Sequence, residues 1–530
     1  MLNSFLLSEP VREKRPREID QYRSKPLSRW IAELPAANHG LTTRLLHDRI
    51  SSINRTDMDA NLRLEAIETL SVSYHRILDY LSWRIRGKGF PLGTNEQKIG
   101  TLLLSMSTEY AMAYWICLRE SSKEQSNWRT RKHMALIVQR VMREYANILM
   151  SCYLLRLPES DWIWMDLHSL YKLALKQQIQ GVKIKNPLAR QEQNTTIEDT
   201  YKQILLFHMS YPYGLTQKEI IQVYFWSEQW SQLVQLLGKG DSTGALSFPG
   251  WVVNSDEDRA PYWLEQKDAY EEHFYRIDVN PLLRWFKEQY TKTNPGPGRF
   301  ELLTEVEERD YSLTHGLLNY LEYRFAGQSL SGSGLFQGGG EVLLSIGLKA
   351  THQQLKAPSK HDEIVTGEWL VNIEPDNRTL SCHFSQYGQI FIGGLVSVKS
   401  LDSGDDRRFM GIVCSIFMER IDAKVQFQII VLTPNISAVG IQPQETKSDD
   451  VLYQRGLLLL QETHTRDKEY LVVSAQNLKD GDILKLLKDD DHSYSIQLKN
   501  RQNIGLGYIQ FEYEVLPDEE KEIIRGYDFI

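Results

Sequence analysis

The sequence lacks the features that mark several large classes of protein. It contains only four cysteines, Cys117, Cys152, Cys382 and Cys414, which lie far apart and form no C-x-x-C pair. We therefore expect free thiols rather than a disulfide framework. The first ten residues, MLNSFLLSEP, have neither the basic start nor the apolar stretch of a signal peptide. No uncharged apolar run reaches about 18 residues, so we predict no transmembrane helix and a cytoplasmic location.

Positive charge is also scarce. The formal net charge is −8, whereas a general nucleic-acid binder needs a concentrated positive face, so no nucleic-acid partner is expected. Basic residues crowd together near the start, in PVREKRPREIDQYRSKP, which contains Arg12, Lys14, Arg15 and Arg17. We interpret residues 1–38 as a solvated, flexible basic segment rather than a site for an anionic partner.

The motifs of enzymes and metal sites are missing as well. The sequence has no G-x-S-x-G elbow, no G-x-x-x-x-G-K-[ST] loop and no G-x-G-x-x-G after a strand. Its 13 histidines are scattered, without an H-x-x-x-H or E-x-x-H cluster that would bind a metal ion. We predict no catalytic residues, no metal site and no cofactor.

What the sequence does have, in its first half, is the periodicity of helices. Apolar residues recur at i, i+3, i+4 and i+7 over 67–81 and over 134–149. Two capping boxes mark the starts of further helices, Thr195-x-x-Glu198 and Thr216-x-x-Glu219. These patterns predict an all-helical domain over 39–292.

One helical stretch, WMDLHSLYKLA, contains Trp164-x-x-Leu167-His168-x-x-Tyr171. This is the first-helix pattern of a tetratricopeptide repeat with histidine at the glycine position, but no other stretch repeats it at a spacing of about 34 residues. We therefore predict tetratricopeptide-like helix hairpins without a regular solenoid. Core packing is the favoured role of Trp164, Leu167 and Tyr171.

The pattern changes beyond this domain. TKTNPGPGRF (291–300) breaks the helical periodicity, one more helical segment follows, and GQSLSGSGLFQGGG (327–340) is typical of a flexible connector. Residues 293–340 are thus predicted to be a linker with one helix. The next stretch, EVLLSIGLKATHQQL, could form one helix or a strand that turns into a helix.

From Glu368 onward short alternating segments dominate, at a spacing of about ten residues per strand. This spacing indicates one or two small closed antiparallel β-barrels. We place the first over 341–443 and the second over 450–516, followed by a tail over 517–530. The predicted fold class is α+β, with a helical domain followed by these barrels.

This arrangement resembles a bacterial family in which a helical, repeat-like N-terminal region precedes an atypical PilZ domain. The resemblance is carried by WIWMDLHSLYKLAL, TIEDTYKQILLFHMSYPYGLTQKEI, IDVNPLLRWFKEQ and SIGLKATHQQL, followed by the run of strands. PilZ domains are small β-barrels that bind the second messenger cyclic di-GMP. The resemblance implies a signalling effector that acts on type IV pilus assembly or twitching motility through protein partners.

PilZ domains bind their ligand with a D/N-x-S-x-x-G turn, so the resemblance implies such a turn in this chain. Two stretches of the sequence are candidates for it. NISAVG (435–440) has the spacing, but the following IQPQETKSDD is not expected to form the barrel strand that such a turn precedes. The order of the strands favours Asn372-x-Glu374-x-x-Asn377 instead and leaves 435–440 at the exit of the barrel. Glu374 then replaces the serine, and Asn377 replaces the glycine, although asparagine tolerates a positive φ.

The resemblance also implies an R-x-x-x-R segment, whose planar guanidinium groups can bind phosphate or guanine in a bidentate way. The nearest match is Lys356-x-x-x-Lys360, which lacks that fork. Arg378 and Arg407-Arg408 are further cations that we interpret as solvated surface charges. If cyclic di-GMP binds, Lys356, Lys360 and Arg378 are predicted to supply positive charge and Asn372 a hydrogen bond.

Three functions are compatible with these patterns. The first is a cyclic-di-GMP effector, and the second is an interaction scaffold whose degenerate barrel binds no nucleotide. The third is a pair of oligonucleotide-binding barrels, which would need basic strand faces with interleaved aromatic residues. The strands here are mostly aliphatic with mixed charge, so the third is disfavoured.

Overall fold

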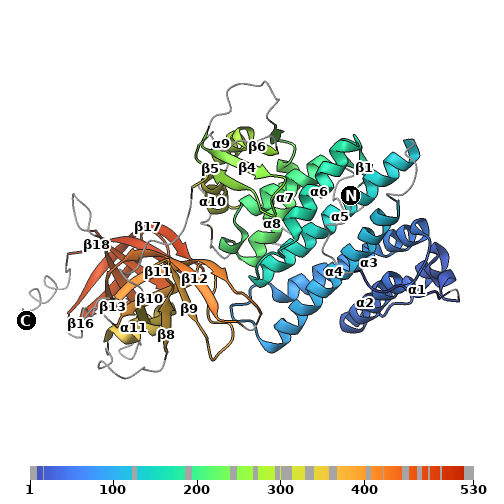
Figure 1. Cartoon of the computed structure of the whole chain (residues 1–530). Helices are drawn as coiled ribbons and strands as arrows, with labels where there is room; N and C mark the ends of the chain where they lie inside the picture. Colours follow the sequence, from blue (N-terminus) through green and yellow to red (C-terminus); the bar gives the residue numbers. More distant parts are fainter. Residues whose placement is uncertain are drawn as a thin grey trace, which may run out of the picture.

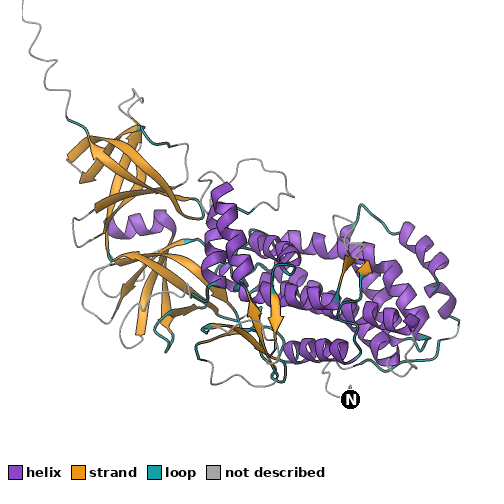
Figure 2. Cartoon of the chain, turned by 90° about the horizontal axis from the view of Figure 1, so that it is seen from above, coloured by secondary structure: helices purple, strands orange, loops and turns teal. Residues whose placement is uncertain are grey.

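The computed structural model is elongated, with the helices at one end and two β-barrels at the other (Figures 1 and 2). The structure describes residues 9–15, 17–121, 128–185, 194–238, 248–266, 273–292, 299, 313–328, 340–356, 367–401, 408–421, 423–443, 453–461, 468–474, 478–489 and 492–517. Within these ranges, no helix is long and apolar enough to cross a membrane. The four cysteines are free thiols, and all but Cys414 are fully buried.

The N-terminal half is a bundle of helices. They are η1 (Ile19–Tyr22), α1 (Ser24–Ala32), α2 (His39–Arg55), α3 (Ala60–Ile85), α4 (Thr94–Ser121), α5 (Trp128–Leu155), α6 (Ile163–Lys176), α7 (Ile197–Met209), η2 (Pro212–Gly214) and α8 (Gln217–Trp230). The predicted capping box at Thr216 is present at the start of α8. At α7 the capping residue is Thr196 rather than Thr195, because the Thr196 hydroxyl accepts the backbone N–H of Asp199.

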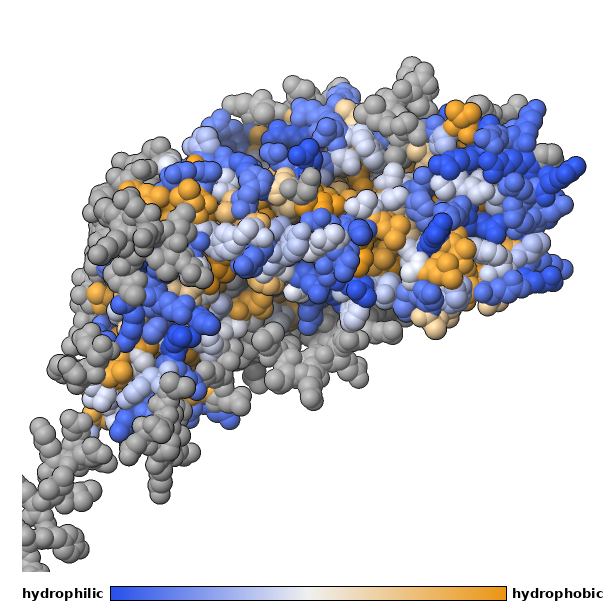
Figure 3. Space-filling view, turned by 90° about the horizontal axis from the view of Figure 1, so that it is seen from below, coloured by the Kyte–Doolittle hydropathy of each residue, from blue (hydrophilic) through white to orange (hydrophobic). Residues whose placement is uncertain are grey.

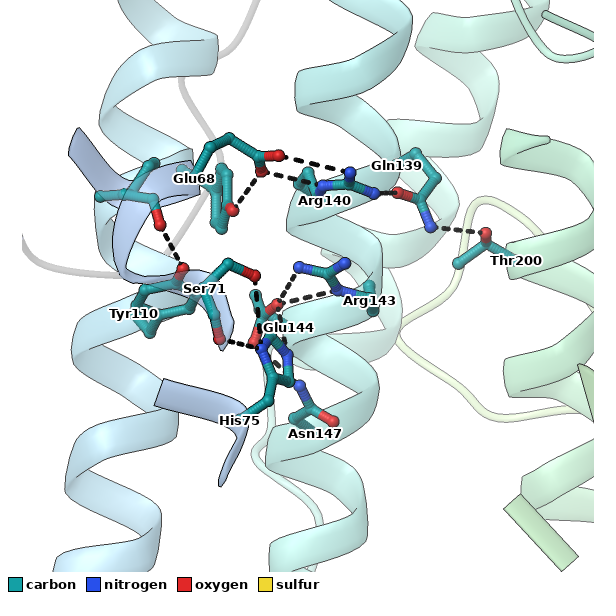
Figure 4. Close-up of polar contacts among 12 residues, drawn as sticks. Glu68, Ser71, His75, Tyr110, Gln139, Arg140, Arg143, Glu144, Asn147 and Thr200 are labelled. Carbon is teal, nitrogen blue, oxygen red and sulfur yellow. Dashed lines mark hydrogen bonds and ion pairs between the residues drawn. The ribbon is translucent and has the colours of Figure 1, made fainter. Parts of the chain in front are cut away.

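The centre of the bundle holds a buried network of charged side chains from α3 and α5 (Figure 4). Arg140 Nε donates to Glu68 Oε1 at 2.9 Å, and Arg143 Nη2 donates to Glu144 Oε1 at 2.9 Å. Burial by itself would raise the pKa of Glu144, but the charges of Arg143 and His75 lower it to about 2. The acids and bases of the network neutralise one another, so we assign it to the packing of the helices.

A small sheet interrupts the helical domain. Its four strands are β3 (Gln235–Leu237), β4 (Gly250–Asn254), β5 (Tyr262–Leu264) and β6 (Phe274–Asp278), in the order β3-β6-β4-β5 and all antiparallel. The prediction of an all-helical domain over 39–292 is therefore wrong at 235–278. β4 is buried along its whole length, so its sequence lacks the alternation that marks a half-exposed strand. A two-stranded ribbon also joins β1 (Ile184–Lys185) to β2 (Asn194–Thr195), and α9 (Asn280–Lys292) and α10 (His315–Phe325) follow the sheet.

The N-terminal segment packs on the helices, contrary to the prediction of a flexible tail over 1–38. The backbone N–H of Glu13 donates to Arg55 O at 2.8 Å, and Asp57 N–H donates to Glu13 O at 2.9 Å. Arg12 forms an ion pair with Glu120 on α4. These partners lie far along the chain, so local composition did not reveal them. Residues 1–8 lie outside the described ranges.

Two closed antiparallel barrels form the C-terminal half, which confirms the predicted fold class. The first consists of β7 (Gly340–Ile346), β8 (Glu368–Ile373), β9 (Thr379–Cys382), β10 (Leu395–Ser400), β11 (Arg408–Phe417) and β12 (Val425–Thr433). The second consists of β13 (Asn435–Pro443), β14 (Gln454–Gln461), β15 (Lys468–Ser474), β16 (Ile483–Asp489), β17 (His492–Gly505) and β18 (Tyr508–Val515).

The boundary between the barrels differs from the prediction. The first barrel was predicted to extend to residue 443, but β13 pairs with β14 and β16 of the second barrel. The boundary therefore lies between Thr433 and Asn435. The stretch 441–450 was not expected to form a barrel strand, yet its first three residues belong to β13, and 444–452 lie outside the described ranges.

A helix joins the two barrels. α11 (Gly347–Lys356) follows β7 and packs against β7 and β10 of the first barrel and against β13 and β14 of the second. It begins at Gly347, whose φ of 81° allows the sharp turn from strand to helix. Of the two forms that the sequence allowed for this stretch, the strand that turns into a helix is the observed one. An apolar cluster that includes Leu348, Leu395 and Leu457 fills the space between the barrels.

The helical domain and the first barrel share one continuous core. Arg156, which follows α5 with a φ of 62°, donates through Nη1 to Pro212 O at 2.9 Å. Its own carbonyl accepts the N–H of Met418, just beyond β11, at 2.8 Å. The rings of Tyr213 and Phe417 meet edge to face, with their centroids 5.5 Å apart. These contacts connect the two parts through η2 and β11.

Candidate ligand site on the barrels

The predicted binding turn is a tight hairpin between β8 and β9. Asn377 has a φ of 55°, the left-handed conformation that its asparagine side chain was expected to tolerate. The Asp376 carboxylate accepts the backbone N–H groups of Arg378 at 2.9 Å and Thr379 at 2.8 Å. Asn372 lies next to this hairpin, on the exposed face of β8. The structure thus brings Asn372, Glu374, Asn377 and Arg378 together at one end of the first barrel.

The charge of this hairpin is unfavourable for a diphosphate. Lys424 Nζ donates to Glu374 Oε1 at 2.6 Å, and this hydrogen bond lowers the pKa of Glu374. Glu374 therefore remains a carboxylate, and Asp376 places a second one in the same turn. Lys424 and Arg378 balance these two charges, so the hairpin offers an anionic ligand no net positive charge.

The predicted cations are dispersed. Lys356 is the last residue of α11. The hairpin lies at the Gly340 end of β7, because Gly340 pairs with Ile373, whereas α11 begins at Gly347, beyond the other end of β7. Lys360 and Arg407 lie outside the described residues. The interpretation of Arg408 as a surface charge is wrong, because its buried guanidinium binds Glu368 and donates to Ser345 Oγ at 3.0 Å.

A different group of cations lies at the barrel seam, which we define as α11 with the facing strands β13 and β14. His352 Nε2 lies 3.1 Å from Val439 O, so α11 contacts the backbone of β13. The pKa of His352 is lowered by burial, against the effect of that hydrogen bond, and further by the positive charges of Lys356 and Arg455. Lys356, at the end of α11, and Arg455 of β14 therefore both lie within electrostatic reach of His352.

The stretch 435–440 is part of this seam, but as a strand and not as a turn. Val439 and Ile441 point into the core of the second barrel, so Asn435 and Ser437 lie on that same strand face. Gly440 lies on the other face, directly opposite Arg455 of β14. The three motif positions therefore do not converge on one ligand.

Sequence reasoning missed His352 and Arg455. The helical spacing in GLKATHQQLK after a glycine could have revealed α11 and its histidine. Arg455 gave no comparable signal, because its proximity to α11 depends on how the two barrels pack.

Comparison with known proteins supports the assignment of the helical region. Residues 25–241 match the model of a family described as "Cyclic-di-GMP receptor FimW, N-terminal domain". The predicted resemblance to cyclic-di-GMP effectors is confirmed. The matched range contains the helices from α1 to α8 and excludes both barrels.

A curated relative extends the similarity. The chain is 23% identical over 347 residues to the "Cyclic-di-GMP receptor FimW" of Pseudomonas aeruginosa, which covers 64% of this chain and 54% of that protein. The chain thus spans about half the length of this relative. No solved structure matches the chain.

Proposed function

We propose that this protein is a cytoplasmic effector of cyclic di-GMP that acts through protein contacts, without catalysis. The observation that supports this proposal most is the similarity over 347 residues to a cyclic-di-GMP receptor. So long an alignment extends beyond the 25–241 range of the N-terminal family. The similarity therefore involves more of the chain than the helical bundle.

The barrel seam is our candidate for the ligand site. Lys356 and Arg455 supply positive charge for the phosphates, and the guanidinium of Arg455 can bind phosphate or a guanine edge in a bidentate way. Lys360, the second lysine of the predicted Lys356-x-x-x-Lys360 segment, lies outside the described residues. A ligand at this position would contact both barrels at once, so that binding would stabilise one arrangement of the two.

The β8–β9 hairpin is the weaker candidate. It holds Asn372, Asn377 and Arg378, but the charges of Glu374 and Asp376 offset those of Lys424 and Arg378, so it offers an anionic ligand no net positive charge. Its polar groups also bind one another, as in the hydrogen bonds from Arg378 and Thr379 to Asp376. This self-contained turn favours the alternative function, a scaffold that binds no nucleotide.

The helical domain is the proposed docking surface for a protein partner. Val72 and Trp83 on α3 are large apolar side chains that are 54% and 50% exposed. They lie about three helical turns apart and so on the same side of α3. The face of the molecule shown in Figure 3 is mostly hydrophilic, with apolar patches between the hydrophilic residues. We propose that the partner belongs to the type IV pilus or surface-motility machinery, as the family resemblance implies.

Calorimetric titration of the full chain with cyclic di-GMP tests the ligand and its site together. We expect saturable heat with micromolar affinity for the wild type. The Lys356→Ala/Arg455→Ala double variant should bind at least about tenfold more weakly, which corresponds to about 1.4 kcal/mol. Arg378→Ala removes a cation from the hairpin instead and is the matched control. It should bind cyclic di-GMP with the affinity of the wild type.

Two outcomes would contradict this proposal in different ways. Loss of binding in Arg378→Ala alone would move the site to the hairpin. No heat up to about 100 μM cyclic di-GMP, for a protein shown to be folded, would leave the scaffold function.

A further inference from the structure

The segment Gly388–Gly394 connects β9 to β10 of the first barrel and touches both other parts of the molecule. Towards the helical domain it pairs with the loop after α3. Phe90 N–H donates to Ile390 O at 2.8 Å, and Ile390 N–H donates to Phe90 O at 2.9 Å. Gly388 N–H also donates to Pro91 O at 2.9 Å. This reciprocal backbone bridge ties the segment to the helical domain.

The other end of the segment is bound to the second barrel. Leu506 N–H, in the turn between β17 and β18, donates to Gly393 O at 2.7 Å. Gly393 N–H donates in turn to Val413 O on β11 at 2.8 Å, which fixes the segment to its own barrel. The two ends of one short segment are thus hydrogen-bonded to two different domains.

Glycines make both contacts possible. A Cβ atom on Gly505 would lie 2.6 Å from Gly393 O, and one on Gly89 would lie 2.7 Å from Gly388 O. Gly388 and Gly393 themselves have φ values of 71° and 81°. At Gly505 backbone meets backbone directly, and at Gly89 the backbone of Gly388 and the ring of Phe391 are equally close, so little room is left at either contact to absorb a movement.

The same turn of the second barrel also reaches the seam. A Cβ atom on Gly347, the first residue of α11, would lie 3.3 Å from Tyr508 Oη. The interior of the segment is anchored as well, since Ile390 and Ile392 are buried in the core shared with the helices. A shift of the β17–β18 turn would therefore act on Gly393 and, through the anchored segment, on Phe90.

We propose that Gly388–Gly394 is a relay that couples the position of the second barrel to the Gly89–Pro91 loop of the helical domain. The coupling is a property of the ligand-free chain. Only the idea that a nucleotide at the barrel seam shifts the second barrel rests on the proposed function. A contiguous path does not by itself establish energetic coupling, so the test measures the coupling directly.

Hydrogen exchange of the full-length, ligand-free protein provides that test. Gly505→Ala should displace the β17–β18 turn and accelerate exchange of the Phe90 amide by about tenfold or more, as its bond to Ile390 O opens more often. Gly507→Ala is the matched control: its φ is 80°, so alanine strains the backbone of the same turn, but nothing lies within 4 Å of the new methyl group. Gly507→Ala should leave Phe90 exchange unchanged.

A reverse variant keeps the test decisive if Gly505→Ala fails to fold. Gly89→Ala perturbs the helical side, and reciprocal coupling predicts faster exchange of the Leu506 amide in the second barrel. Phe90 exchange that is equal in Gly505→Ala and Gly507→Ala, or Leu506 exchange unaffected by Gly89→Ala, would overturn the relay.

A second set of exchange measurements, with cyclic di-GMP added, distinguishes the relay from the proposed nucleotide site. Nucleotide should change Phe90 exchange in the wild type, and Gly505→Ala should abolish that change while it still binds. If the wild type binds no nucleotide, the ligand-free comparison still decides the relay. If nucleotide binds to the wild type but Phe90 exchange does not change, the effect of nucleotide binding is not transmitted through the relay.

Discussion

At the scale of single residues, Arg408 and Arg378 show how differently two arginines in one barrel can behave. Arg408 and Glu368 are both buried and paired with each other, whereas Arg378 lies on an exposed hairpin. A buried ion pair contributes little net stability, but the loss of one partner leaves an uncompensated charge in the core. An exposed charge has no such consequence.

Arg408→Ala should therefore lower the free energy of opening of the first barrel by about 3–5 kcal/mol. Hydrogen exchange of β7 and β8 amides measures this opening separately from the rest of the molecule. Arg378→Ala should change it by less than about 1 kcal/mol. The double variant Arg408→Met/Glu368→Leu should cost less than Arg408→Ala, because no charge is left unpaired. Equal effects of Arg408→Ala and Arg378→Ala would contradict this account of the pair.

The sequence could predict residue properties that depend on the local backbone, and no others. The left-handed conformation of Asn377 followed from the short turn between two strands, and the cap at Thr216 from a four-residue motif. The burial of Arg408 depends on Glu368 and Ser345, residues that only strand pairing brings close. Lys356 was predicted as a site cation, but its neighbour Arg455 comes from a barrel that the local pattern does not connect to it.

At the scale of elements, α11 is the most consequential helix of the C-terminal half. It lies between β7 and β8 in chain order and packs against strands of both barrels, so the apolar cluster at the seam contains residues of both. Its start could be read from Gly347 and the helical spacing that follows. Its contacts with β13 and β14 could not, because they depend on the docking of one closed barrel against another.

Leu348→Ala tests the role of α11 in holding the barrels together. Leu348 is buried in the seam cluster, so its truncation should cost about 2–5 kcal/mol and weaken the contact between the barrels. Calorimetric unfolding should show the second barrel melting in a separate, earlier transition. The exposed neighbour Lys349→Ala is the control and should melt like the wild type. A single transition unchanged in Leu348→Ala would mean that the barrels do not depend on α11.

At the scale of the whole molecule, the change from a helical half to a barrel half was predictable, because the hydrophobic period changes from 3.6 to 2 near residue 340. The small sheet around β4 was not, since a fully buried strand has no alternation. The barrel boundary was placed too late because polar residues after Gly440 resemble a linker. The prediction from composition was also wrong at the N-terminus, where residues of the basic segment bind acidic side chains and backbone groups of helices that are distant in the sequence.

Cyclic di-GMP is proposed to bind at the barrel seam of this chain. Hydrogen exchange across the full-length protein, with and without saturating cyclic di-GMP, tests it most directly. The account predicts slower exchange in α11, β13 and β14 on addition of nucleotide. Slower exchange confined to the β8–β9 hairpin or to the helical domain, or no change anywhere at about 100 μM nucleotide, would contradict it.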